Sequence, residues 1–84
     1  MEKILLDFRQ MQEPRQMQEY MEKRFQFPEY YGGNLDALYD MLTDITEETC
    51  VEIIGISHPY YDKIRRVFCD AEENNPYLSV AFRD

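Results

Sequence analysis

The sequence is poor in the residues on which many enzyme active sites depend. Its single histidine, His58, directly precedes Pro59, and no glycine-rich nucleophile turn surrounds Ser57, so a histidine-based catalytic triad has little support. We expect His58 to be a loop or helix-capping residue. Gly32 and Gly33 are adjacent, but they lack the spacing of a phosphate-binding or dinucleotide-binding loop, and no basic residue follows them. A nucleotide-dependent enzyme is therefore disfavoured.

Long hydrophobic runs are absent as well. No apolar stretch approaches the roughly 20 residues that a membrane-spanning helix requires. The N-terminal segment MEKILLDFRQ is interrupted at Asp7 and Arg9 and has no small-residue cleavage motif, so we expect no signal peptide and a cytoplasmic location. In a reducing compartment, Cys50 and Cys69 are expected to be buried free thiols rather than a disulfide.

The chain does contain enough apolar material for one small globular domain over residues 1–84. Hydrophobic residues make up 44% of the sequence and aromatic residues 14%, which is too apolar for a disordered segment. Short β-branched runs predict strands, and apolar residues at helical spacing predict helices. The strands are expected at residues 3–8, 50–56 and 77–82, and the helices at residues 14–25, from Asn34 to about Ile45, and from Pro59 onward.

The order of these elements, β-α-α-β-α-β, determines the predicted fold. Strands separated by helices favour parallel pairing with right-handed crossovers. We therefore predict an α/β fold with a small three-stranded parallel sheet, formed by Ile4 to Asp7, Val51 to Ile56 and Leu78 to Phe82, with helices packed on it. Leu38 and Leu42 fall on the apolar stripe of the middle helix and are expected in the core.

The net charge of −8 is concentrated in the middle of the chain. Between Phe25 and Asp62 there is no lysine or arginine, whereas the remaining segments contain nine acidic and nine basic residues. The acidic residues of the middle segment are Glu29, Asp36, Asp40, Asp44, Glu47, Glu48, Glu52 and Asp62. Such a field repels nucleic acid and membrane surfaces and attracts a cationic partner. A merely solubilising surface is the other interpretation of the same charge.

Asp36 and Asp40 lie four residues apart on the predicted middle helix, a spacing at which like charges repel by about 0.2–0.5 kcal/mol. The free N–H groups of the first turn favour Asp36, but they favour Asp40 and Asp44 less. The pair could bind a metal ion such as Mg²⁺ or act in acid–base chemistry, although no other ligand is placed nearby. Tyrosines interleaved with these carboxylates instead favour a protein-binding surface.

The run FPEYYGGNLDALYDMLT, residues 27–43, resembles the LPEYYGxNLDALWDxLT run of the barstar family, intracellular inhibitors of secreted guanyl-specific ribonucleases of the barnase type. The segment VFCDA in the last helix is similar to the family's VFREA. Tyr39 stands where the family has tryptophan, and Gly33 where it has an acidic residue. By position, Tyr30 and Asp36 resemble contact residues, Asp40 the carboxylate that enters the ribonuclease active site, and Asp70 the acidic residue of the last helix.

The resemblance implies a stoichiometric, non-enzymatic inhibitor that needs no cofactor or metal, is a monomer when free, and binds a cationic ribonuclease through an acidic helix-loop surface. The partner-binding residues implied are Tyr30, Tyr31, Gly32, Gly33, Asn34, Asp36, Tyr39, Asp40, Thr43, Asp44 and Asp70. An immunity protein against a different basic toxin nuclease shares this surface and remains open at this point. A small metal-dependent enzyme is a third alternative, and it would require activity of the chain alone.

Overall fold

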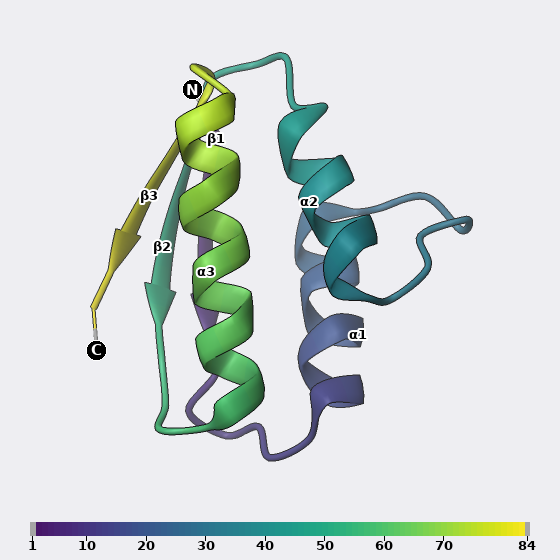
Figure 1. Cartoon of the computed structure of the whole chain (residues 1–84), viewed down its shortest axis with the longest axis vertical. Helices are drawn as coiled ribbons and strands as arrows, with labels where there is room; N and C mark the ends of the chain where they lie inside the picture. Colours follow the sequence, from purple (N-terminus) through teal and green to yellow (C-terminus); the bar gives the residue numbers. More distant parts are fainter. Residues whose placement is uncertain (1, 84) are drawn as a thin grey trace.

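A computed structural model describes residues 2–83 of the chain (Figure 1). Three strands form one parallel sheet in the order in which they occur along the chain, and three helices lie in the connections, two between the first and second strands and one between the second and third. The strands are β1 (Glu2–Asp7), β2 (Thr49–Ile54) and β3 (Leu78–Phe82), and the helices are α1 (Pro14–Phe25), α2 (Leu35–Thr43) and α3 (Pro59–Asn74). This arrangement confirms the predicted α/β fold and its β-α-α-β-α-β order.

The sheet is covered on one face only. Strands that lie side by side in chain order, joined by right-handed crossovers, place all the helices on the same face. Burial alternates accordingly along β1, where Ile4 and Leu6 are buried and Leu5 is 44% exposed. In β2, Val51 and Ile53 are buried while Glu52 is exposed. In Figure 1, α3 crosses in front of the sheet, with α2 and α1 beside it.

Local signals explain where the helices begin. Pro14 and Pro59 each occupy the first turn of a helix, where the missing N–H of proline costs nothing. His58 is the N-cap of α3, and its Nδ1 accepts a hydrogen bond of 3.0 Å from the Tyr60 N–H. The predicted capping role of His58 is therefore confirmed.

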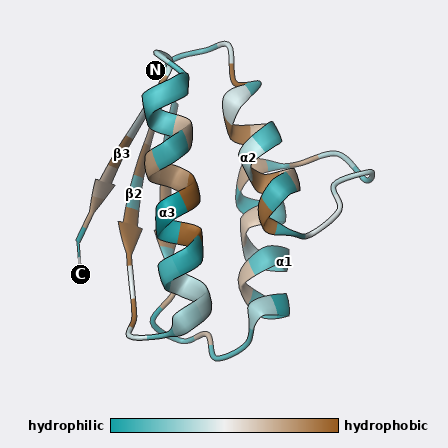
Figure 2. Cartoon of the chain, in the orientation of Figure 1, coloured by the Kyte–Doolittle hydropathy of each residue, from teal (hydrophilic) through white to brown (hydrophobic). Residues whose placement is uncertain are grey.

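The core lies between the sheet and the helices. Leu38 and Leu42 of α2 are fully buried, as predicted, together with Phe68 of α3 and Leu6 of β1. Figure 2 shows the hydrophobic positions concentrated in the strands and along parts of α2 and α3. None of the helices within residues 2–83 combines the length and apolar character needed to cross a bilayer.

Two elements end two residues before their predicted ends. Strand β2 ends at Ile54 rather than Ile56, because the Ile54 carbonyl accepts the last ladder bond, 2.9 Å from the Phe8 N–H, and the chain then turns away. At Gly55 the backbone passes so close to Tyr61 that a Cβ atom would lie 2.2 Å from the tyrosine ring. Helix α2 likewise ends at Thr43 rather than Ile45.

The cysteines are free, as predicted, but the prediction that both are buried is wrong. Cys69 is exposed and Cys50 is only half-buried. Cys69 follows the fully buried Phe68 on α3, and the 100° step of a helix turns it out of the core. Cys50 lies on the face of β2 that no helix covers.

Candidate partner-binding surface

The loop between α1 and α2 is attached to the core by a row of aromatic rings. The Phe25 and Phe27 rings stack with their centroids 5.1 Å apart, and the Phe27 and Tyr31 centroids are 4.7 Å apart. Tyr31 is consequently only 8% exposed, whereas its neighbour Tyr30 is 80% exposed. The two tyrosines of the resemblance motif therefore have different positions, one inside the molecule and one on its surface.

A buried hydrogen-bond relay fixes the same loop. Gln18 of α1, only 5% exposed, donates from Nε2 to the Tyr60 hydroxyl at 2.8 Å and accepts at Oε1 from the Tyr31 hydroxyl. Burial raises the pKa of the Tyr31 hydroxyl well above its ordinary range, and Tyr60 and Glu22 act in the same direction. The hydroxyl therefore remains a protonated donor at neutral pH, and the relay joins α1, the loop and α3.

The backbone at the end of the loop favours a glycine. Gly33 has a φ of +66°, in the left-handed region where a side chain is disfavoured, and no atom would contact a Cβ there within 4 Å. The Tyr31 N–H donates to the Pro28 carbonyl at 2.9 Å, which closes the preceding turn. A glycine at this position thus serves the backbone path and leaves the surface beside it open.

Helix α2 begins at a side-chain cap and displays its carboxylates outward. Asn34 Oδ1 accepts a hydrogen bond of 2.8 Å from the Ala37 N–H, which confirms the predicted N-cap. Asp36 lies in the first turn, Asp40 one turn later, and Asp44 at the C-cap, and all three are exposed. The structure therefore brings these three predicted residues onto one outer surface, following Tyr30 and the loop.

Contacts with α3 fix the orientation of this surface. The Tyr39 hydroxyl accepts a hydrogen bond of 3.1 Å from Asn74 Nδ2, so this half-buried side chain joins α2 to α3. Thr43 donates from Oγ1 to the Tyr39 carbonyl at 2.9 Å, within its own helix. Asp70 is exposed on α3 and shares a groove with Leu35 at the start of α2. The acidic residue of the last helix therefore lies near the N-terminal end of α2.

The carboxylates of α2 differ from some other carboxylates of residues 2–83 in making no ion pair there. Elsewhere Asp7 pairs with Arg9 at 2.9 Å, and Glu19 pairs with Arg15 at 3.0 Å. The Arg9 guanidinium lowers the pKa of Asp7 to about 2, mainly through their hydrogen bond. Within residues 2–83, by contrast, no ion pair involves a carboxylate of α2. The outer surface of α2 thus keeps its negative charge available for a partner.

A metal site has no geometric support in the described part of the chain. No group of three or more histidine, cysteine, aspartate or glutamate side chains there could hold a metal ion. Asp36 and Asp40 therefore stand without the further ligands that a hard cation needs.

The sequence analysis did not predict the roles of three residues that shape this surface: Gln18, Tyr60 and Phe27. Gln18 has a weak signal, because it is a polar residue inside the apolar stripe that contains Met17 and Met21. Phe27 begins the run that carries the family resemblance, but its packing role and that of Tyr60 have no sequence signal, because they depend on which rings and hydroxyl groups meet in three dimensions.

The sequence of the chain is similar to sequences of known proteins. The sequence model of the family described as "Barstar (barnase inhibitor)" matches residues 1–81. A Bacillus subtilis (strain 168) protein named "Putative ribonuclease inhibitor YrdF" is 42% identical over 43 residues, which is 51% of this chain and 47% of that protein. The chain thus aligns with about half the length of this relative. Because the family match extends over nearly the whole chain, the protein belongs to the Barstar family.

Proposed function

We propose that the chain, as a single domain, is a stoichiometric inhibitor that binds and blocks the active site of a barnase-type guanyl-specific ribonuclease. The observation that carries this proposal is Asp40, which lies exposed in the middle of α2 and in no ion pair within residues 2–83. Its own helix explains this charge poorly, since Asp36 and Asp44 lie one turn away on either side. In the cytoplasm, such a monomeric chain would act by binding alone.

The chemistry of the target supports this role. A ribonuclease active site must hold phosphate, and arginine, lysine and histidine side chains serve that purpose. A rigid surface of carboxylates can occupy those groups in place of the phosphate. The barnase–barstar pair is itself one of the complexes from which such generalisations about charge complementarity were drawn.

The proposed binding surface combines the loop, the outer face of α2 and one residue of α3. Tyr31 belongs to it as the buried anchor of the loop, and the other members face solvent or lie half-buried. The surface consists of Tyr30, Tyr31, Gly32, Gly33, Asn34, Asp36, Tyr39, Asp40, Thr43, Asp44 and Asp70.

The proposal is tested by titrating a barnase-type ribonuclease with the wild-type chain and with two variants. Asp40→Ala should weaken inhibition by at least about 2 kcal/mol, roughly thirtyfold, because truncation leaves cationic groups of the partner buried without a counter-charge. Asp44→Ala is the matched control, since it also removes one carboxylate from α2, and it should weaken inhibition less. Equal losses would point to a diffuse acidic face, and a wild-type chain that leaves the ribonuclease active would refute the proposal.

A further inference from the structure

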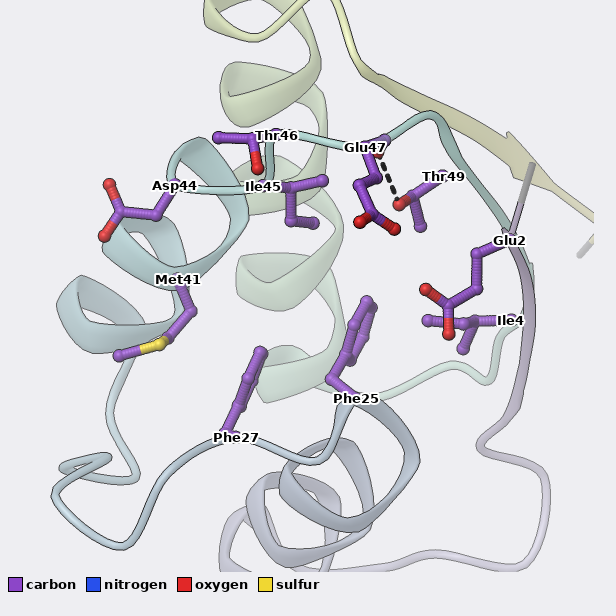
Figure 3. A pocket seen from close by; sticks show the side chains of 10 residues that line it. All are labelled: Glu2, Ile4, Phe25, Phe27, Met41, Asp44, Ile45, Thr46, Glu47 and Thr49. Atoms are coloured by element: carbon purple, nitrogen blue, oxygen red, sulfur yellow. Dashed lines mark hydrogen bonds between the residues drawn. The ribbon is translucent and has the colours of Figure 1, made fainter.

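A groove of about 320 Å³ opens beside the C-terminal end of α2 and shares only Asp44 with the binding surface described above (Figure 3). Its apolar lining comes from Ile4 of β1, Phe25 at the end of α1, Phe27 of the loop, and Met41 and Ile45 around the end of α2. All but Ile4 are half-buried. These side chains therefore leave a recess that residues 2–83 do not fill.

The aromatic part of the lining is preorganised. The Phe25 and Phe27 rings lie nearly parallel, with an interplanar angle of 7°, and each also contacts a further ring, Phe27 that of Tyr31 and Phe25 that of Phe68. Figure 3 shows the two rings side by side, pointing into the recess. A flat group that enters the groove would meet a rigid aromatic wall.

The described residues that line the groove carry charge of one sign. Among residues 2–83, the charged lining residues are Glu2, Asp44 and Glu47, and no lysine or arginine lines the groove. Figure 3 shows the Glu2 and Glu47 side chains directed toward the recess opposite the rings, and Asp44 at the outer edge. No ion pair within residues 2–83 involves these carboxylates. The groove therefore offers an aromatic wall opposed by two carboxylates.

We propose that this groove is a socket for an arginine side chain of the basic protein partner. A guanidinium is planar, stacks on aromatic faces and pairs with carboxylates, so it matches both sides of the recess. The compact, strongly hydrated ammonium of lysine matches the aromatic wall less well. The inference rests on the proposed function, because Asp44 at the rim lies one helical turn from Asp40, and one partner seated on α2 can reach both.

The test uses the full chain and removes charge without changing shape. The double variant Glu2→Gln/Glu47→Gln neutralises both carboxylates that face the rings, and Glu48→Gln is the matched control, since Glu48 is exposed but does not line this groove. Affinity for a barnase-type ribonuclease should fall about tenfold in the double variant, mainly through faster dissociation, and less than about twofold in the control. Thermal unfolding should be unchanged in both.

If the double variant and the control bind the ribonuclease equally well while Asp40→Ala clearly loses affinity, the proposed arginine socket is refuted and the proposed function still holds. If the wild-type chain does not bind the ribonuclease, the proposed function fails. NMR then tests separately whether the groove binds an arginine side chain. An arginine-containing tripeptide amide should shift the Phe25 and Phe27 ring signals of the wild-type chain, whereas the citrulline analogue, which lacks the charge, should not. If the shift is absent, or if it persists in the double variant, the proposal that the groove binds an arginine side chain is refuted.

Discussion

The inner and outer faces of α2 differ in what surrounds them. Leu38 and Leu42 on the inner face are fully buried in the core cluster. Asp36 and Asp40 on the outer face are exposed and lie in no ion pair within residues 2–83. One nine-residue helix thus places its packing groups and its charged groups on opposite sides. Stability and binding should therefore respond to different substitutions in the same helix.

The adjacent tyrosines of the loop show the same separation. Tyr31 is buried, hydrogen-bonded to Gln18 and packed on Phe27, whereas Tyr30 is 80% exposed. Tyr31 thus attaches the loop to the core, and the preceding residue, Tyr30, is exposed to solvent. The loop can therefore stay fixed through Tyr31 while the Tyr30 side chain is available for contacts with a partner.

The largest expected effect is on the inner face of α2. Leu42→Ala should lower the free energy of unfolding by about 2–5 kcal/mol, because it removes buried methyl groups and leaves a cavity in a small core. For a domain of this size, a loss of that order corresponds to a fall in melting temperature of at least about 8 °C. A shift of only a few degrees in a thermal scan would contradict the placement of Leu42 in the core.

The two tyrosines offer a closer comparison. Tyr31→Phe should destabilise the chain by about 1–3 kcal/mol, because the buried Oε1 of Gln18 loses its hydrogen-bond donor. Tyr30→Phe, the same chemical change on the surface, should stay within about 0.5 kcal/mol. Urea unfolding of both variants measures the difference, and equal effects would mean that the relay does not hold the loop.

The Tyr31 relay should also make the stability depend on pH in the alkaline range. The pKa of Tyr31 is raised on folding. Its contribution to the free energy of unfolding is therefore fully present below the ordinary tyrosine pKa of about 10, and it is lost as the pH rises through the higher pKa of the folded state. Unfolding free energies measured from pH 7 upward should therefore stay level to about pH 10 and then fall. In Tyr31→Phe this fall should be smaller, and an identical alkaline profile would contradict the assignment.

Unpaired charge on the outer face should control the rate of association. The rate constant for binding a cationic ribonuclease should fall about tenfold or more between about 0.01 M and 0.15 M salt, as the Debye length shrinks from about 30 Å to about 8 Å. Dissociation should change little. Asp36→Asn should slow association at low salt more than Glu19→Gln, which removes the same charge from a residue paired with Arg15. Rates that do not respond to salt would exclude steering by this surface.

The smallest expected effect concerns the stability of the free chain. Asp40→Ala should leave it unchanged or raise it by about 0.2–0.5 kcal/mol, because repulsion from Asp36 and Asp44 at four-residue spacing is relieved. Thermal unfolding of the isolated variant measures this. Loss of folding would mean that the Asp40 carboxylate supports the structure rather than a partner.

The fold was largely predictable because its signals are local. β-branched runs, proline at helix starts and the Asn34 cap act within a few residues, and the helices between strands favour parallel pairing. The end of β2 was not predictable from the sequence. It depends on the last hydrogen bond between the strands, from the Phe8 N–H to the Ile54 carbonyl, and on the close approach of the Gly55 backbone to Tyr61. The burial of Cys69 was mispredicted for a related reason, because its exposure depends on how α3 is rotated against the sheet.

The amino-acid sequence by itself determined the element order, the acidic segment and the motif that resembles the Barstar family, because composition, periodicity and spacing are properties of neighbouring residues. Only the tertiary structure decided that Tyr31 is an anchor while Tyr30 is exposed, that Gln18 and Tyr60 complete a relay, and that Glu2 and Glu47 face the same pair of rings. Each of these relations joins groups from different elements. Their distances are set by the packing of helices on the sheet, which spacing along the chain does not specify.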